Sequence, residues 1–177
     1  SYDCGRVITD KRELYNIVFN DEAYNSLWRK CAKASCFDGR DHSRYYHIKR
    51  GEDLLQSLEI IENAGSFLFI PETLYCYRVN PASITHSDSY EGYRANFEVR
   101  ETVLEFLGKS GVFTEEDYDR LRNNDMDRVA VELKRICRYA PTREAKREAI
   151  ASIRDSAYYK HFLEPGYRPA SPLPGDE

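Results

Sequence analysis

The sequence predicts an α+β fold that is mostly helical, and three observations support this prediction. Apolar residues recur with helical spacing over residues 9–19, 52–64 and most of 89–160. Two short runs rich in aromatic and aliphatic residues, 66–70 and 73–79, predict strands. Four of the seven prolines follow residue 163 and predict an extended tail.

Composition describes a folded protein with a polar surface and excludes two classes of function. The chain has 177 residues, 41% of them hydrophobic and 32% charged, with a net charge of −4. A nucleic-acid-binding protein normally carries a basic footprint, so nucleic acid is not expected as a partner. No apolar run approaches the length of a membrane span.

The five cysteines are odd in number and scattered, without a C-x-x-C pair. This pattern is typical of reduced thiols in a cytoplasmic protein. We therefore expect a cytoplasmic location, with association at the cytoplasmic face of a membrane left as an alternative.

The first 50 residues contain one clear helix and two less regular segments. The helix is predicted over residues 9–19, with Thr9 or Asp10 as its N-cap. Residues 25–30 fit a helix or a short strand equally well. Residues 38–50 have no clean period and form a basic, aromatic loop in an acidic protein.

The middle of the chain predicts a helix followed by two strands. An apolar stripe runs through residues 52–64, and Gly65 stands where a C-terminal cap glycine belongs. Strands are predicted at 66–70 and 73–79. Two strands cannot make an independent sheet, so further strands either lie within residues 1–50 or are missing from this chain.

Helices are predicted through the rest of the chain. The first ends at Gly108 and Gly111, and Thr114 opens the second with capping-box spacing. That second helix has a possible break at residues 123–125. A third begins after Thr142. The apolar stripes predict helix packing, with an oligomer interface or a membrane-proximal face as the alternatives.

Two carboxylates, Glu52 and Asp53, open the predicted middle helix and allow two interpretations. Acids in a first turn meet free backbone N–H groups and the positive end of the helix dipole, which contributes about 0.3–1 kcal/mol each. Alternatively, one carboxylate acts as a general base. The two roles are compatible in one side chain.

The stretch GEDLLQSLEIIENAGSFLFIPETLYCYRVNPASIT, residues 51–85, resembles the C-terminal part of family 2 glycosyltransferases. These are GT-A-type enzymes that use nucleotide-diphosphate sugars. The family pattern joins an acidic pair at a helix start, here Glu52 and Asp53, to an I-P-x-x-L-Y-x-Y-R strand and an S-I-T loop. Upstream, NSLWRKCAKASCF resembles the family's tryptophan–lysine element. The resemblance covers about residues 10–88.

The resemblance implies a role for each matching residue. Asp53 would be the catalytic base of an inverting sugar transfer, and Glu52 would orient or touch the acceptor. A guanidinium at Arg78 suits a diphosphate. The substrate-binding residues implied in this way are Trp28, Lys30, Tyr77, Arg78 and His86.

The same resemblance implies what lies outside this chain. Such enzymes place a nucleotide-binding half first, with an Asp-x-Asp that holds a divalent metal, Mn or Mg. We expect no cofactor in this chain, because its only such pairs, Asp117/Asp119 and Asp125/Asp127, lie in predicted helix, where positions i and i+2 face different ways.

We therefore expect a fragment that is inactive alone and requires the missing N-terminal half. The implied domains are an acceptor-side GT-A-like portion (1–88), with a small β element from the end of the family's sheet, a helical subdomain (89–163) and a proline-rich tail (164–177). The complete protein that the resemblance implies is a bacterial hexosyltransferase of cell-surface polysaccharide synthesis. Its ligands would be a nucleotide sugar and a glycan acceptor. The competing hypothesis is a non-catalytic helical module for protein interaction.

Overall fold

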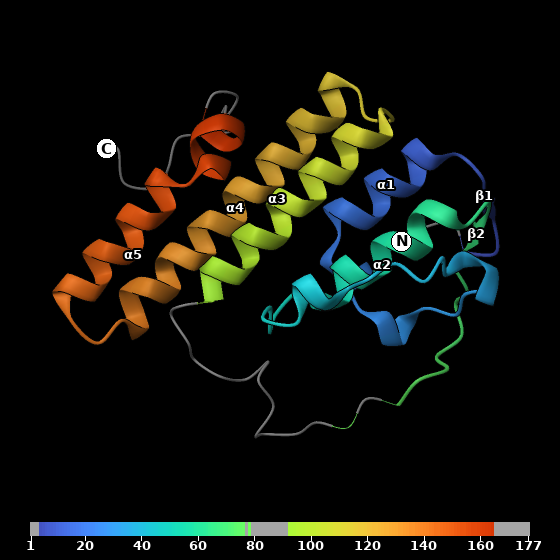
Figure 1. Cartoon of the computed structure of the whole chain (residues 1–177), viewed down its shortest axis with the longest axis horizontal. Helices are drawn as coiled ribbons and strands as arrows, with labels where there is room; N and C mark the ends of the chain where they lie inside the picture. The colour runs from blue at the N-terminus through green and yellow to red at the C-terminus, as the bar shows by residue number, and fades with distance from the viewer. Residues whose placement is uncertain (1–3, 77, 79–91, 165–177) are drawn as a thin grey trace. The chain divides into compact units, whose positions relative to one another are not determined.

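The computed structural model describes residues 4–76, 78 and 92–164 (Figure 1). These described residues are 67% helical and contain one two-stranded antiparallel sheet, which confirms the predicted α+β, mostly helical class. Contacts divide the chain into two compact units. The N-terminal unit comprises Ser1–Ser87 with Glu98–Val112, and the C-terminal unit comprises Asp88–Phe97 with Phe113–Glu177.

The predicted first helix is confirmed as α1 (Lys11–Asn20). The carboxylate of Asp10 accepts a hydrogen bond from the backbone N–H of Arg12, at 2.9 Å, and caps its N-terminus. On its buried face, the rings of Tyr15 and Phe19 meet the ring of Phe106 with centroids 5.4 and 5.9 Å apart. These aromatic contacts form part of the core of the N-terminal unit.

The sheet pairs β1 (Val7–Ile8) with β2 (Phe67–Leu68), Val7 opposite Leu68. The strand expected within 66–70 is therefore present, and its partner comes from the first 50 residues. The prediction of a strand at 73–79 is wrong for the part of this segment that the structure describes. Residues 73–76 and 78 form no strand. Those residues are exposed, so their alternating side chains have no buried face to pack.

Between α1 and the next helix, residues 21–50 form only single 3-10 turns. These are η1 (Glu22–Tyr24), η2 (Leu27–Arg29), η3 (Ala34–Cys36) and η4 (Ser43–Tyr45). The ambiguous segment 25–30 thus forms a 3-10 turn rather than an α-helix or a strand. Within the predicted basic loop, Tyr45 and Ile48 are buried and anchor it by their apolar side chains.

The predicted middle helix is confirmed as α2 (Glu52–Asn63). Its N-cap is Gly51, whose φ of 85° lies in the left-handed region. A Cβ at this position would lie 2.9 Å from a methyl carbon of Val99. Both the backbone conformation and the space therefore require glycine.

The C-terminus of α2 is capped by a lysine, so the predicted Gly65 cap is wrong. Ala64 ends the helix with extended backbone, and Gly65 has no positive φ. The Lys11 ammonium instead donates to the carbonyls of Ile61 (2.7 Å), Glu62 (3.0 Å) and Ala64 (2.6 Å). A cation on the last carbonyls satisfies the same groups that a glycine cap would.

The predicted helices of the second half appear as α3 (Gly92–Ser110), α4 (Glu115–Tyr139) and α5 (Arg143–Asp155), followed by a π-helical turn, η6 (Tyr159–Leu163). Within the C-terminal unit, α5 runs back along α4 (Figure 1). Thr114 and Asp117 form the predicted capping box, and Thr142 caps α5. Gly108 lies inside α3, and only Gly111 follows its end.

The possible break at residues 123–125 is absent, because α4 is continuous there. Asp125 is buried and accepts a hydrogen bond from the hydroxyl of Tyr158. The Nε of Arg128 lies 3.3 Å from the other carboxylate oxygen of Asp125. These contacts satisfy a buried charge within the helix. The predicted domain boundary at 88 and the tail from 164 stay predictions.

We predict that Gly51→Ala lowers the free energy of unfolding of the N-terminal unit by about 1–3 kcal/mol, because a positive φ and a close contact both oppose a Cβ. Fluorescence of Trp28, the chain's only tryptophan, reports unfolding of this unit in denaturant. Gly65→Ala is the matched control, since a Cβ there meets nothing within 4 Å. Equal stabilities of the two variants would contradict the account of Gly51.

Candidate functional site

Asp53 lies in the first turn of α2 and is half-buried. Its Oδ2 accepts a hydrogen bond from the backbone N–H of Leu27, at 3.1 Å. Leu27 is the first residue of η2, so the Asp53 carboxylate caps a neighbouring turn that is distant in sequence. No described residue donates to its Oδ1, which leaves that oxygen able to accept a proton.

Glu52 is also half-buried at the start of α2. It forms no hydrogen bond or ion pair with any other described residue. Its position beside Asp53 fits the predicted acceptor contact without testing it.

Lys30 joins this region through the end of η2. Its ammonium donates to the carbonyls of Tyr24 (2.6 Å) and Ser26 (2.9 Å). Burial lowers the pKa of Lys30 to about 8, while the negative charge of Asp53 acts to raise it. Two of the three N–H donors of this ammonium thus hold the chain between η1 and η2 in place. The third N–H is available to a ligand.

Trp28 presents an aromatic surface together with Tyr75. Their ring centroids lie 4.5 Å apart with the planes tilted by 32°, and the Arg29 guanidinium lies 4.6 Å over the tryptophan ring. Both rings are partly exposed, Trp28 at 37% and Tyr75 at 51%. Exposed aromatic faces suit ligands with apolar C–H surfaces. Sequence reasoning missed Tyr75, because the family pattern pointed to Tyr77.

The remaining predicted residues are not joined to this group. Arg78 is exposed and forms no hydrogen bond or ion pair with another described residue. Tyr77 and His86 lie outside the described residues. The structure thus brings Asp53 and Lys30 together near Trp28, and it shows no contact between them and Arg78.

The basic loop within residues 38–50 is held to α2 by a residue that sequence reasoning missed. Glu59 is buried and accepts hydrogen bonds from the backbone N–H groups of Asp38 and Gly39, the latter at 3.1 Å. Its second oxygen lies 3.0 Å from Nε2 of His42. The only sequence signal was a carboxylate between the apolar Leu58 and Ile60.

The part of the chain that the structure describes holds no cluster of three or more His, Cys, Asp or Glu side chains suited to a metal ion. In α4, Asp117 and Asp125 are buried, whereas Asp119 and Asp127 are exposed. Each pair therefore faces two ways, and neither fits a divalent cation. Among the described helices, none has the length and apolar character of a membrane span.

No family model matches the chain, and neither the curated proteins nor the solved structures contain a match.

We predict that two substitutions of Asp53 distinguish the stability contributed by its hydrogen bond from the stability contributed by its charge. An asparagine oxygen can still accept from the Leu27 N–H, so Asp53→Asn should lose only the contribution of the charge, about 0.3–1 kcal/mol. Asp53→Ala loses the acceptor as well and should cost about 1 kcal/mol more than Asp53→Asn. Denaturant unfolding followed by Trp28 fluorescence measures both. Equal losses in the two variants would show that the hydrogen bond is not what Asp53 contributes.

We predict that Lys30 titrates near pH 8 and that Asp53→Asn lowers its pKa further, because the Asp53 charge raises it. Lysine labelled with ¹³C at Cε reports this titration by NMR. Between pH 8 and the ordinary value of 10.5, the folded state binds fewer protons than the unfolded state. Stability should therefore rise with pH in this window, and Lys30→Met should lack that rise. An unshifted lysine titration would refute the assignment.

Proposed function

We propose that this chain is the acceptor-side part of an inverting family 2 glycosyltransferase. The proposed reaction transfers a sugar from a nucleotide-diphosphate sugar to an acceptor hydroxyl, in synthesis of a bacterial cell-surface polysaccharide at the cytoplasmic side. One observation carries the proposal. The hydrogen bond from Leu27 to Asp53 joins the two parts of the family pattern, which lie 26 residues apart.

The proposed chemistry assigns Asp53 as the general base. Its carboxylate takes the proton of the acceptor hydroxyl while the acceptor oxygen bonds to the anomeric carbon and the bond to the diphosphate breaks. The N–H of Leu27 fixes one carboxylate oxygen, which leaves the other to receive the proton. A base held in this way contributes roughly 10²–10⁴-fold to the rate. The neighbouring rings of Trp28 and Tyr75 offer a face for the acceptor sugar.

Exposed apolar side chains in the N-terminal unit support the proposal that another protein segment binds to this unit. Five of them lie in β1, β2 and the segment that follows: Val7, Leu68, Ile70, Leu74 and Tyr75, each 49% exposed or more. Val7 and Leu68 are opposite each other in the sheet, and exposed apolar residues that adjoin in this way are typical of an interaction surface. In this proposal, the N-terminal nucleotide-binding half, which also supplies the divalent metal site, docks here.

A non-catalytic interaction module would present the same apolar residues, so they do not separate the two hypotheses. The arrangement of Asp53 supports the enzyme, because a non-catalytic module has no need for a carboxylate with one oxygen fixed by the Leu27 N–H and the other available. We therefore favour the enzyme.

The test uses the protein expressed from its complete reading frame, assayed for nucleoside diphosphate release with a panel of nucleotide sugars and glycan acceptors. We expect Asp53→Asn to lower kcat by about 10²–10⁴-fold while nucleotide-sugar binding is unchanged. Glu101→Gln, an exposed carboxylate on α3, is the matched control and should keep full activity. Undiminished turnover by Asp53→Asn would rule out the base, and a complete protein that binds no nucleotide sugar would rule out the family.

A further inference from the structure

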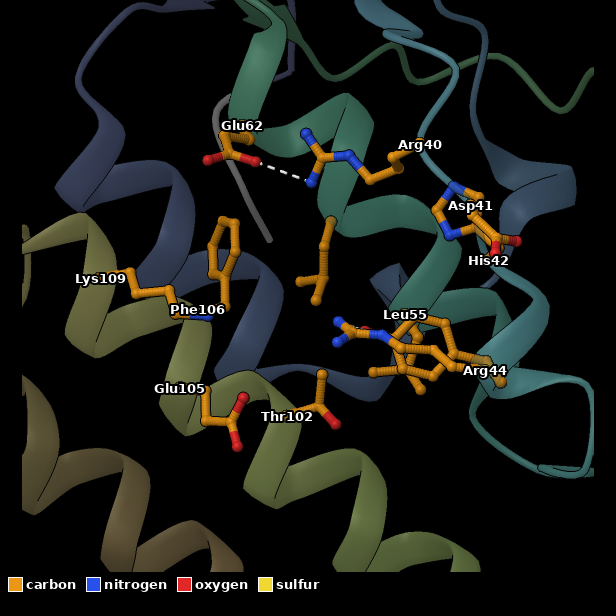
Figure 2. Close-up of a pocket in the computed structure, with 12 residues that line it drawn as sticks. Arg40, Asp41, His42, Arg44, Leu55, Glu62, Thr102, Glu105, Phe106 and Lys109 are labelled. Atoms are coloured by element: carbon orange, nitrogen blue, oxygen red, sulfur yellow. Dashed lines mark hydrogen bonds and ion pairs between the residues drawn. The ribbon is translucent and has the colours of Figure 1, made fainter.

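A pocket of about 190 Å³ opens in the N-terminal unit, between the loop that contains η4, helix α2 and the second half of α3 (Figure 2). Its apolar wall is formed by Leu55 and Leu58 from α2 and Phe106 from α3. Charged side chains surround this wall. Asp53 does not line the pocket, which is therefore separate from the candidate catalytic site.

Several charges around the pocket are already matched within the protein. Arg40 pairs with Asp38 and, at 2.8 Å, with Glu62. Asp41 accepts hydrogen bonds from the backbone N–H and the hydroxyl of Ser43, both at 2.8 Å. These groups hold the loop in shape and leave little charge for a ligand.

Besides Asp41, three charged residues of the lining form no ion pair with any described residue: Arg44, Glu105 and Lys109. The Arg44 guanidinium lies 4.5 Å over the ring of Tyr45 and donates to its hydroxyl, which fixes its direction. Figure 2 shows the Arg44 guanidinium directed toward the side of the pocket that Thr102 occupies. Apart from the Asp41 carboxylate, which the two donors of Ser43 engage, the charge available to a ligand is two positive groups and one negative group.

We propose that this pocket binds a small hydroxylated anion, in which one carboxylate or phosphate group is carried on a body of about one sugar ring. The volume is below the roughly 300–1,000 Å³ of ordinary ligand sites and suits a body of about one sugar ring. The guanidinium of Arg44 and the ammonium of Lys109 bind the anionic group. The carboxylate of Glu105 accepts hydrogen bonds from hydroxyls, and the apolar wall packs against the C–H face.

This ligand class follows from the mixture of charges. A bare anion would gain from Arg44 and Lys109 but would be repelled by Glu105. A neutral polyol would satisfy Glu105 but would leave both cations without a partner. An anion that carries hydroxyl groups satisfies all three. The proposal does not depend on the glycosyltransferase assignment.

Calorimetric titration with D-glucuronate and with glucose 6-phosphate tests this proposal, with D-glucose as the neutral control and inorganic phosphate as the bare anion. We expect at least one of the two hydroxylated anions to bind more tightly than both controls. The one that binds identifies the anionic group. Binding should weaken as ionic strength rises, because the pocket is open to solvent.

Arg44→Gln and Lys109→Gln should each weaken that binding by about tenfold, the effect of losing one charge-assisted hydrogen bond. Lys49→Gln is the matched control, since Lys49 is exposed in the same loop and does not line the pocket. Lys109 forms no hydrogen bond or ion pair with the described residues of the loop, so its variant remains informative if Arg44→Gln disturbs Tyr45. Circular dichroism checks that each variant is folded.

The proposal is overturned if neither hydroxylated anion binds at millimolar concentration, or if D-glucose or inorganic phosphate binds as tightly as they do. It is also overturned if Lys49→Gln weakens binding as much as the folded Lys109→Gln variant.

Discussion

Polar side chains on α2 satisfy the backbone of a long irregular segment, and the N-terminal unit depends on this constraint. Residues 21–50 contain no strand or α-helix, so many of their backbone groups need partners from elsewhere. Asp53 accepts from the N–H of Leu27, Glu59 from those of Asp38 and Gly39, and the Asn63 amide donates to the carbonyl of Cys36 at 3.1 Å. One face of α2 thus serves as the partner that a sheet would otherwise supply.

This constraint explains why both candidate ligand sites border α2. Its first turn places Asp53 beside η2, where Lys30 and the Trp28–Tyr75 pair lie. Further along, Glu59 holds the start of the loop whose side chains form the cationic side of the pocket. In each case, the side chain that shapes the site also satisfies the backbone. A substitution there changes structure and binding together, which is why the isosteric Asp53→Asn is more informative than alanine.

Local signals in the sequence were sufficient to predict the helices, because caps and apolar periodicity act over a few residues. Asp10, Thr114 and Thr142 cap where their spacing indicates. Contacts between distant residues were not predictable in this way. Lys11 replaces the expected glycine cap through carbonyls 50 or more residues away, and Tyr158 supports Asp125 where α4 was expected to break. The pairing of Val7 with Leu68 likewise has no local signature.

In the candidate site, too, the sequence indicated individual residues but not the contact between distant residues. The family pattern singled out Asp53, Lys30 and Trp28 individually, but nothing in their spacing predicts the hydrogen bond that joins Leu27 to Asp53. That bond decides how the carboxylate can act. A carboxylate free to rotate presents either oxygen in many directions, whereas one fixed by an N–H presents its second oxygen in few. Orientation of this kind requires a supporting contact, and here the support comes from the residue next to Trp28. The cap and the proposed base are therefore one arrangement, in which the structural hydrogen bond directs the reactive oxygen.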